Sequence, residues 1–187
     1  MEFRRLRTPE GMEFEQAMQL YSISFPPHEQ REAPSQRCCM GLEEYHFDLL
    51  YDNETWAGII LYWETETFLY VEHFCIFPEL RGRNYGRRAL ECLGKKGKTI
   101  ILEIDPPEDE RSIRRKGFYL RAGFVSNPFP HVHPPYHAGN QGHPLEVLSF
   151  PEGLTEGAYQ EFYRYLRGHV MDGLLNPPDS AEKRRIP

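Results

Sequence analysis

An arginine- and glycine-rich turn, Leu80-Arg81-Gly82-Arg83-Asn84-Tyr85-Gly86-Arg87, follows an apolar stretch of the chain and opens a helical pattern. The first turn of a helix carries backbone N–H groups without partners in the helix, and the helix dipole makes this end positive. An anion such as a pyrophosphate satisfies these donors, and arginine side chains add charge-assisted hydrogen bonds. The residues predicted to bind an anion here are Arg81, Gly82, Arg83, Asn84, Tyr85, Gly86 and Arg87.

The distribution of charge favours a ligand over an ordinary surface turn, which would have a similar sequence. Seven basic residues lie between positions 81 and 98, opposed by Glu91, in a chain whose formal net charge is -6. A domain that binds nucleic acid is usually basic overall. The sequence therefore indicates a local anionic ligand and no nucleic-acid partner.

A second chemical signal is Glu103, which interrupts the otherwise apolar strand expected over residues 99–104. A buried charge is costly unless it is paired or solvated. We therefore expect Glu103 either to face a cleft, where it contacts substrate or water, or to pair with an arginine such as Arg114 or Arg115.

A proline-rich loop over residues 128–144 gathers imidazoles and one tyrosine: His131, His133, Tyr136, His137 and His143. Closely spaced imidazoles can bind a metal. However, no cysteine accompanies them, no HExxH pattern is present, and a proline-rich loop is a poor rigid scaffold. We expect no metal site here.

Length and composition fit a globular protein. The chain has 187 residues, of which 40% are hydrophobic and 27% charged, which favours one domain over residues 1–171 and a polar tail over residues 172–187. No apolar run approaches the ~20 residues that span a membrane, and the N-terminus lacks the apolar region of a signal peptide. We expect a cytoplasmic protein with no membrane contact, whose four cysteines stay reduced.

Hydrophobic periodicity predicts an alternation of strands and helices. Strands are expected over residues 1–6, 45–51, 55–63, 68–77, 99–104, 124–125 and 145–150, and helices follow Gly11 and Gly86 and cover residues 35–40, 110–122 and 156–170. The order predicts an α+β fold in which helices flank a mixed, mostly antiparallel sheet of about six or seven strands.

Two motifs in this order resemble the GNAT superfamily of acetyl-CoA-dependent N-acetyltransferases. The family's acetyl-CoA motif is an Arg or Gln, two residues, Gly, one residue, then Gly or Ala. Arg81 and Gly86 match its ends, and Asn84 stands where the middle glycine is usual; asparagine tolerates a left-handed backbone well. Tyr119, followed by Gly123 and Phe124, matches a second signature at the end of a helix.

The resemblance covers roughly residues 3–150 and implies a three-layer fold whose sheet is splayed between strands 68–77 and 99–104. The pantetheine arm of acetyl-CoA would lie in this gap. Backbone groups at Phe74 and Ile76 occupy the positions that bind pantetheine in the family. The region 128–144 would border the acceptor pocket, so the resemblance makes Glu103, His131, His133 and Tyr136 candidates for binding the substrate.

The resemblance also suggests roles in acetyl transfer. Tyr119 would hydrogen-bond the leaving sulfur and supply a proton, and Glu72, at a position where the family often has a glutamate, would accept one from the amine. An outward-facing strand carboxylate is the alternative for Glu72, and a packing ring is the alternative for Tyr119. Strand alternation predicts that His73 points to the face opposite Glu72.

Together these features predict an enzyme that moves an acetyl group from acetyl-CoA to the primary amine of a small molecule or peptide by direct attack. The alternative is a non-catalytic acyl-CoA-binding sensor or docking module. Cys75 is the thiol nearest the cofactor strand, but no neighbour in the sequence would activate it. The predicted C-terminal helix has more aromatic residues than one buried face requires, which suggests a homodimer contact through Tyr159, Phe162, Tyr163 and Tyr165.

Overall fold

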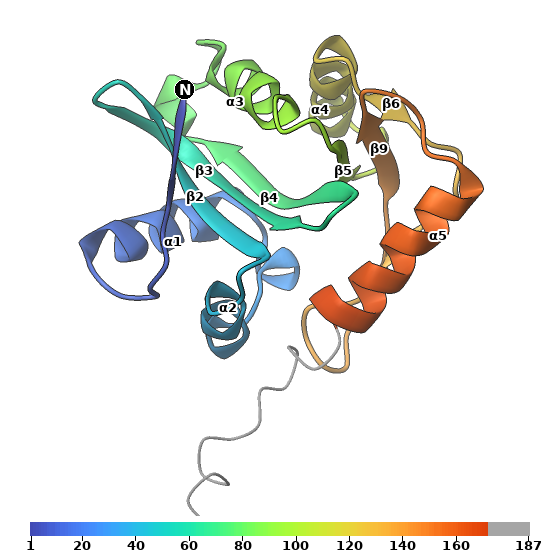
Figure 1. Cartoon of the computed structure of the whole chain (residues 1–187), viewed down its shortest axis with the longest axis horizontal. Coiled ribbons are helices and arrows are strands. Elements are labelled where there is room, and N and C mark those ends of the chain that lie inside the picture. The colour runs from blue at the N-terminus through green and yellow to red at the C-terminus, as the bar shows by residue number, and fades with distance from the viewer. Residues whose placement is uncertain (172–187) are drawn as a thin grey trace, which may run out of the picture.

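The computed structural model describes residues 1–171 and has a seven-stranded sheet at its centre (Figure 1). The strands run in the order β1-β2-β3-β4-β5-β9-β6, and each neighbouring pair is antiparallel except β4 and β5. The predicted α+β fold is confirmed. The strands are β1 (Glu2–Arg5), β2 (Tyr45–Asp52), β3 (Thr55–Glu64), β4 (Phe68–Ile76), β5 (Thr99–Ile104), β6 (Val125–Ser126) and β9 (Glu146–Phe150).

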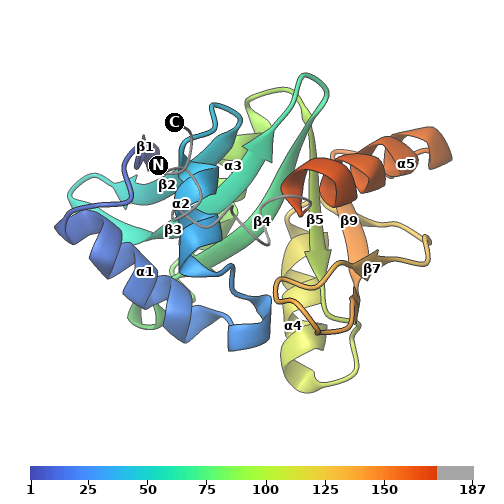
Figure 2. The ribbon, with the colours of Figure 1, turned by 90° about the horizontal axis from the view of Figure 1, so that it is seen from below.

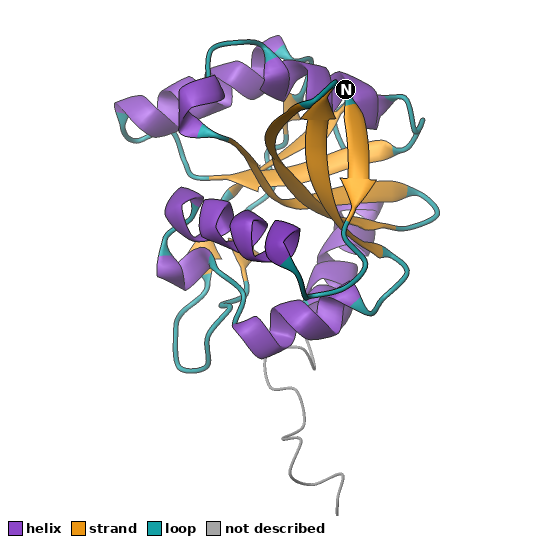
Figure 3. Cartoon of the chain, turned by 90° about the vertical axis from the view of Figure 1, so that its left-hand side faces the viewer, coloured by secondary structure: helices purple, strands orange, loops and turns teal. Residues whose placement is uncertain are grey.

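Helices cover both faces of this sheet, which gives three layers (Figure 3). One face buries Tyr21, Met40 and Phe162 from α1, α2 and α5, and the other buries Leu90 from α3 and Tyr119 from α4. The helices are α1 (Met12–Ser24), α2 (Ala33–Met40), α3 (Tyr85–Gly94), α4 (Glu110–Arg121) and α5 (Glu156–Tyr165), with short helical turns η1 (Pro27–Glu29), η2 (Pro78–Leu80) and η3 (Leu166–Val170).

Strand β3 shows how the sequence produces these layers. Its successive side chains alternate between the two cores: Ile59 and Leu61 pack on the α1 side, whereas Ile60 and Tyr62 pack on the α3 side. A strand that is buried on both faces reads as a continuous apolar run, as this one does. Because each fully buried aliphatic side chain stabilises the fold by about 1.5–3 kcal/mol, β3 anchors the sheet.

The sheet opens between β4 and β5. These strands pair in parallel from Phe68–Thr99 to Val71–Leu102. Beyond Val71, β4 continues to pair with β3, while β5 pairs with β9. The β5-facing edge of β4 is thus left without a strand partner from residue 72 to 76, and Glu103 follows directly after the last pair of β5. This arrangement is the predicted splay.

A register irregularity in β4 overturns one expectation. Leu61 pairs with His73 and Tyr62 pairs with Val71, so Glu72 is an extra residue without a partner in the ladder. Such a β-bulge breaks the alternation of side chains along a strand. The prediction that Glu72 and His73 point to opposite faces is therefore wrong: both side chains are buried, with 4.0 Å between His73 Nδ1 and Glu72 Oε1.

The loop after β6 is more ordered than the sequence predicts. It forms a small hairpin of β7 (Val132–His133) and β8 (His143–Pro144). Figure 2 shows that it reaches from the β9 side of the molecule toward the end of α1. His137 Nε2 lies 2.9 Å from the carbonyl oxygen of Pro27, which fixes the loop against the segment between α1 and α2.

The aromatic residues of α5 pack within the chain. Tyr159 and Phe162 are buried, Tyr159 stacks on Phe129, and Tyr165 packs against Phe68. Tyr163 lies edge-on to an imidazole of the loop. These contacts account for the aromatic content of the helix, and the homodimer stays a prediction.

Two further expectations concern membrane-spanning helices and the C-terminal tail. In the part that the structure describes, no helix has both the length and the apolar character needed to cross a membrane. The predicted polar tail over residues 172–187 lies outside the described residues.

Candidate active site

One cavity of about 720 Å³ joins the arginine- and glycine-rich turn to the open end of the sheet and to the loop after β6. Most of the predicted site residues line it, whereas Arg83 and His131 do not. The predicted residues that it brings together are Glu72, Phe74, Ile76, Arg81, Gly82, Asn84, Tyr85, Gly86, Arg87, Glu103, Tyr119, His133 and Tyr136.

The turn has the backbone shape that a close approach to an anion requires. Gly82 and Asn84 both have positive φ, 76° and 65°, and Asn84 caps α3 in the left-handed conformation expected for it. At Gly86 a Cβ would lie 3.2 Å from the ring of Phe118, so a side chain here would force this ring to shift. Arg81 Nε donates to the carbonyl oxygen of Ile76 at 3.2 Å, which ties the turn to the end of β4.

Tyr119 enters the same cavity from α4. Its ring packs edge-on against Phe118 and Phe124, and 8% of the residue is exposed. Burial raises the pKa of the Tyr119 hydroxyl to about 12. The group therefore stays protonated at neutral pH and can serve as a hydrogen-bond donor.

Glu72 is a buried anion surrounded by donors. Arg31 donates to Oε1 at 2.7 and 3.1 Å, Tyr136 donates to Oε1 at 3.0 Å, and Trp63 donates to Oε2 at 2.8 Å. Burial alone would raise the pKa of Glu72, but the charge of Arg31 and these hydrogen bonds outweigh it and hold the pKa below its usual range. This carboxylate is paired and saturated, which suits a positioning role better than proton transfer.

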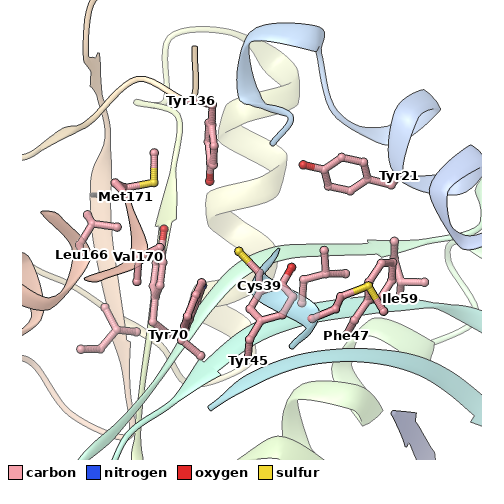
Figure 4. Close-up of a cluster of buried hydrophobic side chains, with 14 of the residues drawn as sticks. Tyr21, Cys39, Tyr45, Phe47, Ile59, Tyr70, Tyr136, Leu166, Val170 and Met171 are labelled. Atoms are coloured by element: carbon pink, nitrogen blue, oxygen red, sulfur yellow. The ribbon is translucent and has the colours of Figure 1, made fainter. Parts of the chain in front are cut away.

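Glu103 has a separate set of partners. Tyr70 donates to Oε2 at 2.5 Å, His131 Nε2 contacts Oε1, and His133 Nε2 lies 3.8 Å from Oε2. Burial would raise the pKa of Glu103, but the two imidazoles and Tyr70 lower it overall. Figure 4 shows the hydroxyl groups of Tyr70 and Tyr136 directed toward the same region above the sheet.

The alternative pairing predicted for Glu103 is wrong. Arg115 pairs with Asp105 at 2.8 Å, and Arg114 pairs with Glu110 at 3.3 Å. Both arginines thus have other carboxylate partners, whereas Glu103 contacts Tyr70 of β4 and His131 of the loop. The other expectation, that Glu103 faces the cleft, agrees with the structure, because Glu103 lines the cavity.

Three residues that could bind a metal lie close together in another part of the cavity wall. Atoms of Glu29, Asp105 and His143 all lie within 4.8 Å of one another. In the structure, Asp105 is already paired with Arg115 and lies 3.3 Å from His143 Nε2. Asp105 thus already has one partner from α4 and one from β8.

Three residues that shape the site were not predicted from the sequence. Arg31 lies in an irregular segment before α2, and its partner is distant in the chain, so no local pattern identifies it. Trp63 and Tyr70 belong to apolar strands and read as core residues. Each has a polar N–H or O–H group in a buried strand, and such a group usually needs a hydrogen-bond partner. This is the one feature of the sequence that could have indicated their role.

Comparisons with known proteins agree with this geometry. Residues 14–124 match the model of the "Acetyltransferase (GNAT) family". A solved structure described as "Putative acetyltransferase from GNAT family", from Bacteroides thetaiotaomicron, is 31% identical, with a TM-score of 0.86 over 91% of this chain and 98% of that one. The Bacillus subtilis protein "Putative acetyltransferase YjbC" is 29% identical over 79 residues, which is 41% of each chain.

A more distant structure shares the fold. An aminoglycoside 6'-N-acetyltransferase complexed with coenzyme A has a TM-score of 0.58 at 15% identity, over 80% of this chain and 96% of that one. The fold is thus that of the GNAT acyltransferases. The chain belongs to the GNAT family of acetyl-CoA-dependent N-acetyltransferases.

Features of this chain fit acetyl-CoA. The left-handed residues Gly82 and Asn84 shape the turn that precedes the first N–H groups of α3. The absence of a side chain at Gly86 leaves room for the rings of Phe118 and Phe74 beside this turn. The unpaired edge of β4 offers backbone groups to an amide-containing arm such as pantetheine, as an added strand would receive them. The residues present therefore fit the cofactor that the family uses.

Proposed function

We propose that this chain transfers an acetyl group from acetyl-CoA to a primary amine by direct attack. The observation that carries the proposal is the meeting, in one cavity, of the glycine-containing turn, the open edge of β4 and the Tyr119 hydroxyl. When bound, acetyl-CoA supplies an activated carbonyl and a thiolate leaving group. The turn and the backbone at Phe74 and Ile76 would hold it along the splay.

Tyr119 is proposed to stabilise the leaving sulfur. A phenol with a pKa of about 12 keeps its proton at neutral pH and donates a hydrogen bond to a thiolate as negative charge develops there. The rings of Phe118 and Phe124 hold the tyrosine ring in place. The hydroxyl is thus the charge-stabilising group at one end of the reacting atoms.

Direct attack is favoured over an acyl-enzyme intermediate. Cys75 is the candidate nucleophile, but burial raises the pKa of its thiol to about 11. Since the thiolate is the nucleophilic form, this cysteine is poorly suited to attack a thioester at neutral pH.

The acceptor end of the cavity lies around Glu72, Glu103, His133 and Tyr136. Glu72 fixes Tyr136 through a hydrogen bond of 3.0 Å, and Glu103 contacts His133. We propose that these residues position the amine of a small molecule or peptide. Whether Glu72 accepts a proton stays a prediction, which its four donors disfavour.

Thiol release tests the proposal. Acetyl-CoA is incubated with the full chain and a panel of polyamines, amino sugars, amino acids and peptides, and free CoA is measured against time. Amine-dependent release supports the enzyme. Saturable binding of acetyl-CoA by calorimetry without release on any amine would instead support the non-catalytic acyl-CoA-binding module.

A further inference from the structure

A hydrogen bond within the loop determines which imidazole nitrogen of His133 carries the proton when the ring is neutral. Its Nδ1 lies 2.5 Å from the carbonyl oxygen of Pro134. A carbonyl oxygen can only accept a hydrogen bond, so Nδ1 carries the proton and the neutral ring has its lone pair on Nε2. The residue lines the cavity and is 4% exposed.

The lone pair on Nε2 has no hydrogen-bond donor among the described residues. It lies 3.8 Å from Oε2 of Glu103, which is another acceptor when ionised. Two acceptors that face each other across this distance leave room for a proton or for the N–H of a ligand. A buried acceptor without a partner is costly, so this pair of atoms is prepared for a donor that the chain itself does not provide.

We propose that His133 is the general base of acetyl transfer, with its Nε2 accepting the proton from the acceptor ammonium and Glu103 stabilising the resulting imidazolium. This inference rests on the proposed function. The ammonium gives one proton to Nε2, and its freed lone pair forms the new C–N bond as the C–S bond breaks. The sulfur takes up the second proton that the nitrogen loses, and His133 later returns its own to solvent.

Other groups in the cavity are less suited to this role. The two carboxylates are held as anions: protonating Glu72 would leave Arg31 buried without its partner, and protonating Glu103 would weaken its contacts with Tyr70 and His131. Both carboxyl pKa values are lowered in the fold. Neither group takes up a proton readily at neutral pH.

His73 is the closest competitor. Its Nε2 contacts the carbonyl oxygen of Glu29 at 2.9 Å, and its Nδ1 has no partner among the described atoms. However, Nδ1 faces Glu72, whose charge Arg31 already neutralises. Burial lowers the pKa of His73, and Arg31 lowers it further. At His133, by contrast, the carboxylate that faces Nε2 is Glu103, which has no arginine partner among the described residues.

The titratable groups around His133 come from several elements. Glu103 faces it from β5, and the ring of Tyr136 stacks on it at 4.9 Å within the loop. Glu72 and His73 belong to β4, and His131 lies just before β7. His143 belongs to β8 and is the partner of His133 in the ladder.

The pH dependence of turnover tests the assignment. In the wild type, kcat/KM should fall as the pH is lowered, because a base that already carries a proton cannot accept one from the ammonium. His133→Gln should lower kcat by about 10²-fold or more and remove this fall, because general base catalysis contributes on that scale. His169→Gln is the matched control: His169 is exposed in η3, outside the cavity lining, and its variant should keep the wild-type profile.

A measurement independent of turnover keeps the proposal falsifiable if the variant folds poorly. Long-range proton–nitrogen NMR of histidine-labelled wild type, with CoA bound, reports the tautomer of the assigned His133. The proton should lie on Nδ1 at high pH. A proton on Nε2 would overturn the proposal.

The outcomes separate the two proposals. If the wild type binds acetyl-CoA but releases no thiol with any amine, the proposed function fails. If the wild type acetylates an amine, and His133→Gln keeps the wild-type rate and the same fall of kcat/KM in acid, the assignment of His133 fails and the proposed function stands. The assignment would also be overturned if the fall of kcat/KM in acid disappeared in His73→Gln but not in His133→Gln.

Discussion

Tyr119 is the residue whose chemistry can be tested most simply. Replacing it with phenylalanine removes the donor and keeps the ring between Phe118 and Phe124. We expect kcat to fall by about 10–10²-fold with little change in KM for acetyl-CoA, because the hydrogen bond forms mainly as charge develops on sulfur. Steady-state thiol release measures both constants.

Tyr51→Phe is the control for this substitution, since Tyr51 lies in β2 and outside the cavity lining. It should leave both constants unchanged. An unaltered kcat in Tyr119→Phe would show that the tyrosine is only a packing residue.

The Glu72–Arg31 pair should determine stability in acid. Glu72→Gln leaves a buried guanidinium without its anion and should reduce the free energy of unfolding by about 3 kcal/mol at pH 7. Because the fold lowers the pKa of Glu72, its contribution is complete above the ordinary carboxyl pKa of about 4.3 and is lost as pH falls through the folded value. Urea denaturation at several pH values should show the difference between the proteins shrinking in acid.

Glu66→Gln is the matched control because Glu66 is exposed in the turn between β3 and β4. Its effect should stay within about 0.5 kcal/mol. A difference between wild type and Glu72→Gln that persists unchanged in strong acid would contradict the role of the ion pair.

Single residues differ in how far the sequence reveals them. Glu103 could be predicted to face the cleft because its charge breaks an apolar strand. Arg31 could not, because it acts through a contact with a residue 41 positions away. The joint placement of Glu72 and His73 depends on a β-bulge, which has no clear sequence signal here.

At the scale of elements, the turn before α3 requires a left-handed residue at Asn84. Asn84→Val should cost about 1–2 kcal/mol of backbone strain, because a side chain branched at Cβ is poorly tolerated there. If the turn opens to relieve the strain, affinity for acetyl-CoA should fall by about 10-fold. Titration calorimetry and urea denaturation measure the two effects.

Two variants isolate the turn from strain in general. Asn84→Gly should keep wild-type affinity, since glycine accepts the same backbone angles. Asn53→Val places similar strain in the β2–β3 turn, where Asn53 has a φ of 51°, and should reduce stability but not affinity. Full affinity in Asn84→Val would contradict the role assigned to this turn.

The elements themselves were largely predictable because strong periodicity defines them. β3 is a continuous apolar run, and β5 is an apolar run interrupted by Glu103 alone. The β7–β8 hairpin was missed because each strand has two residues. Such short pairing is set by contacts of the loop with its surroundings, which local sequence does not encode.

At the scale of the whole molecule, the cavity is lined by positive side chains although the net charge of the chain is negative. The chain is acidic, with a formal charge of -6, but arginines of the turn and of α4 line the cavity: Arg81, Arg87, Arg111, Arg115 and Arg121. The overall charge repels a polyanion such as CoA, whereas this local group attracts it. Binding should therefore depend on a few arginines and weaken as salt screens them.

CoA should stabilise the whole fold by mass action. At a concentration of about 100 Kd, a ligand that binds only the folded state adds about 2.7 kcal/mol, which corresponds to a rise in Tm of roughly 5–10 °C for a chain of this size. Pantetheine, which lacks the diphosphate, should give a much smaller rise at the same concentration. Arg81→Gln should reduce the effect of CoA but not that of pantetheine, and added salt should do the same. Equal stabilisation by the two ligands, or a CoA effect insensitive to salt, would mean that the turn does not hold the diphosphate.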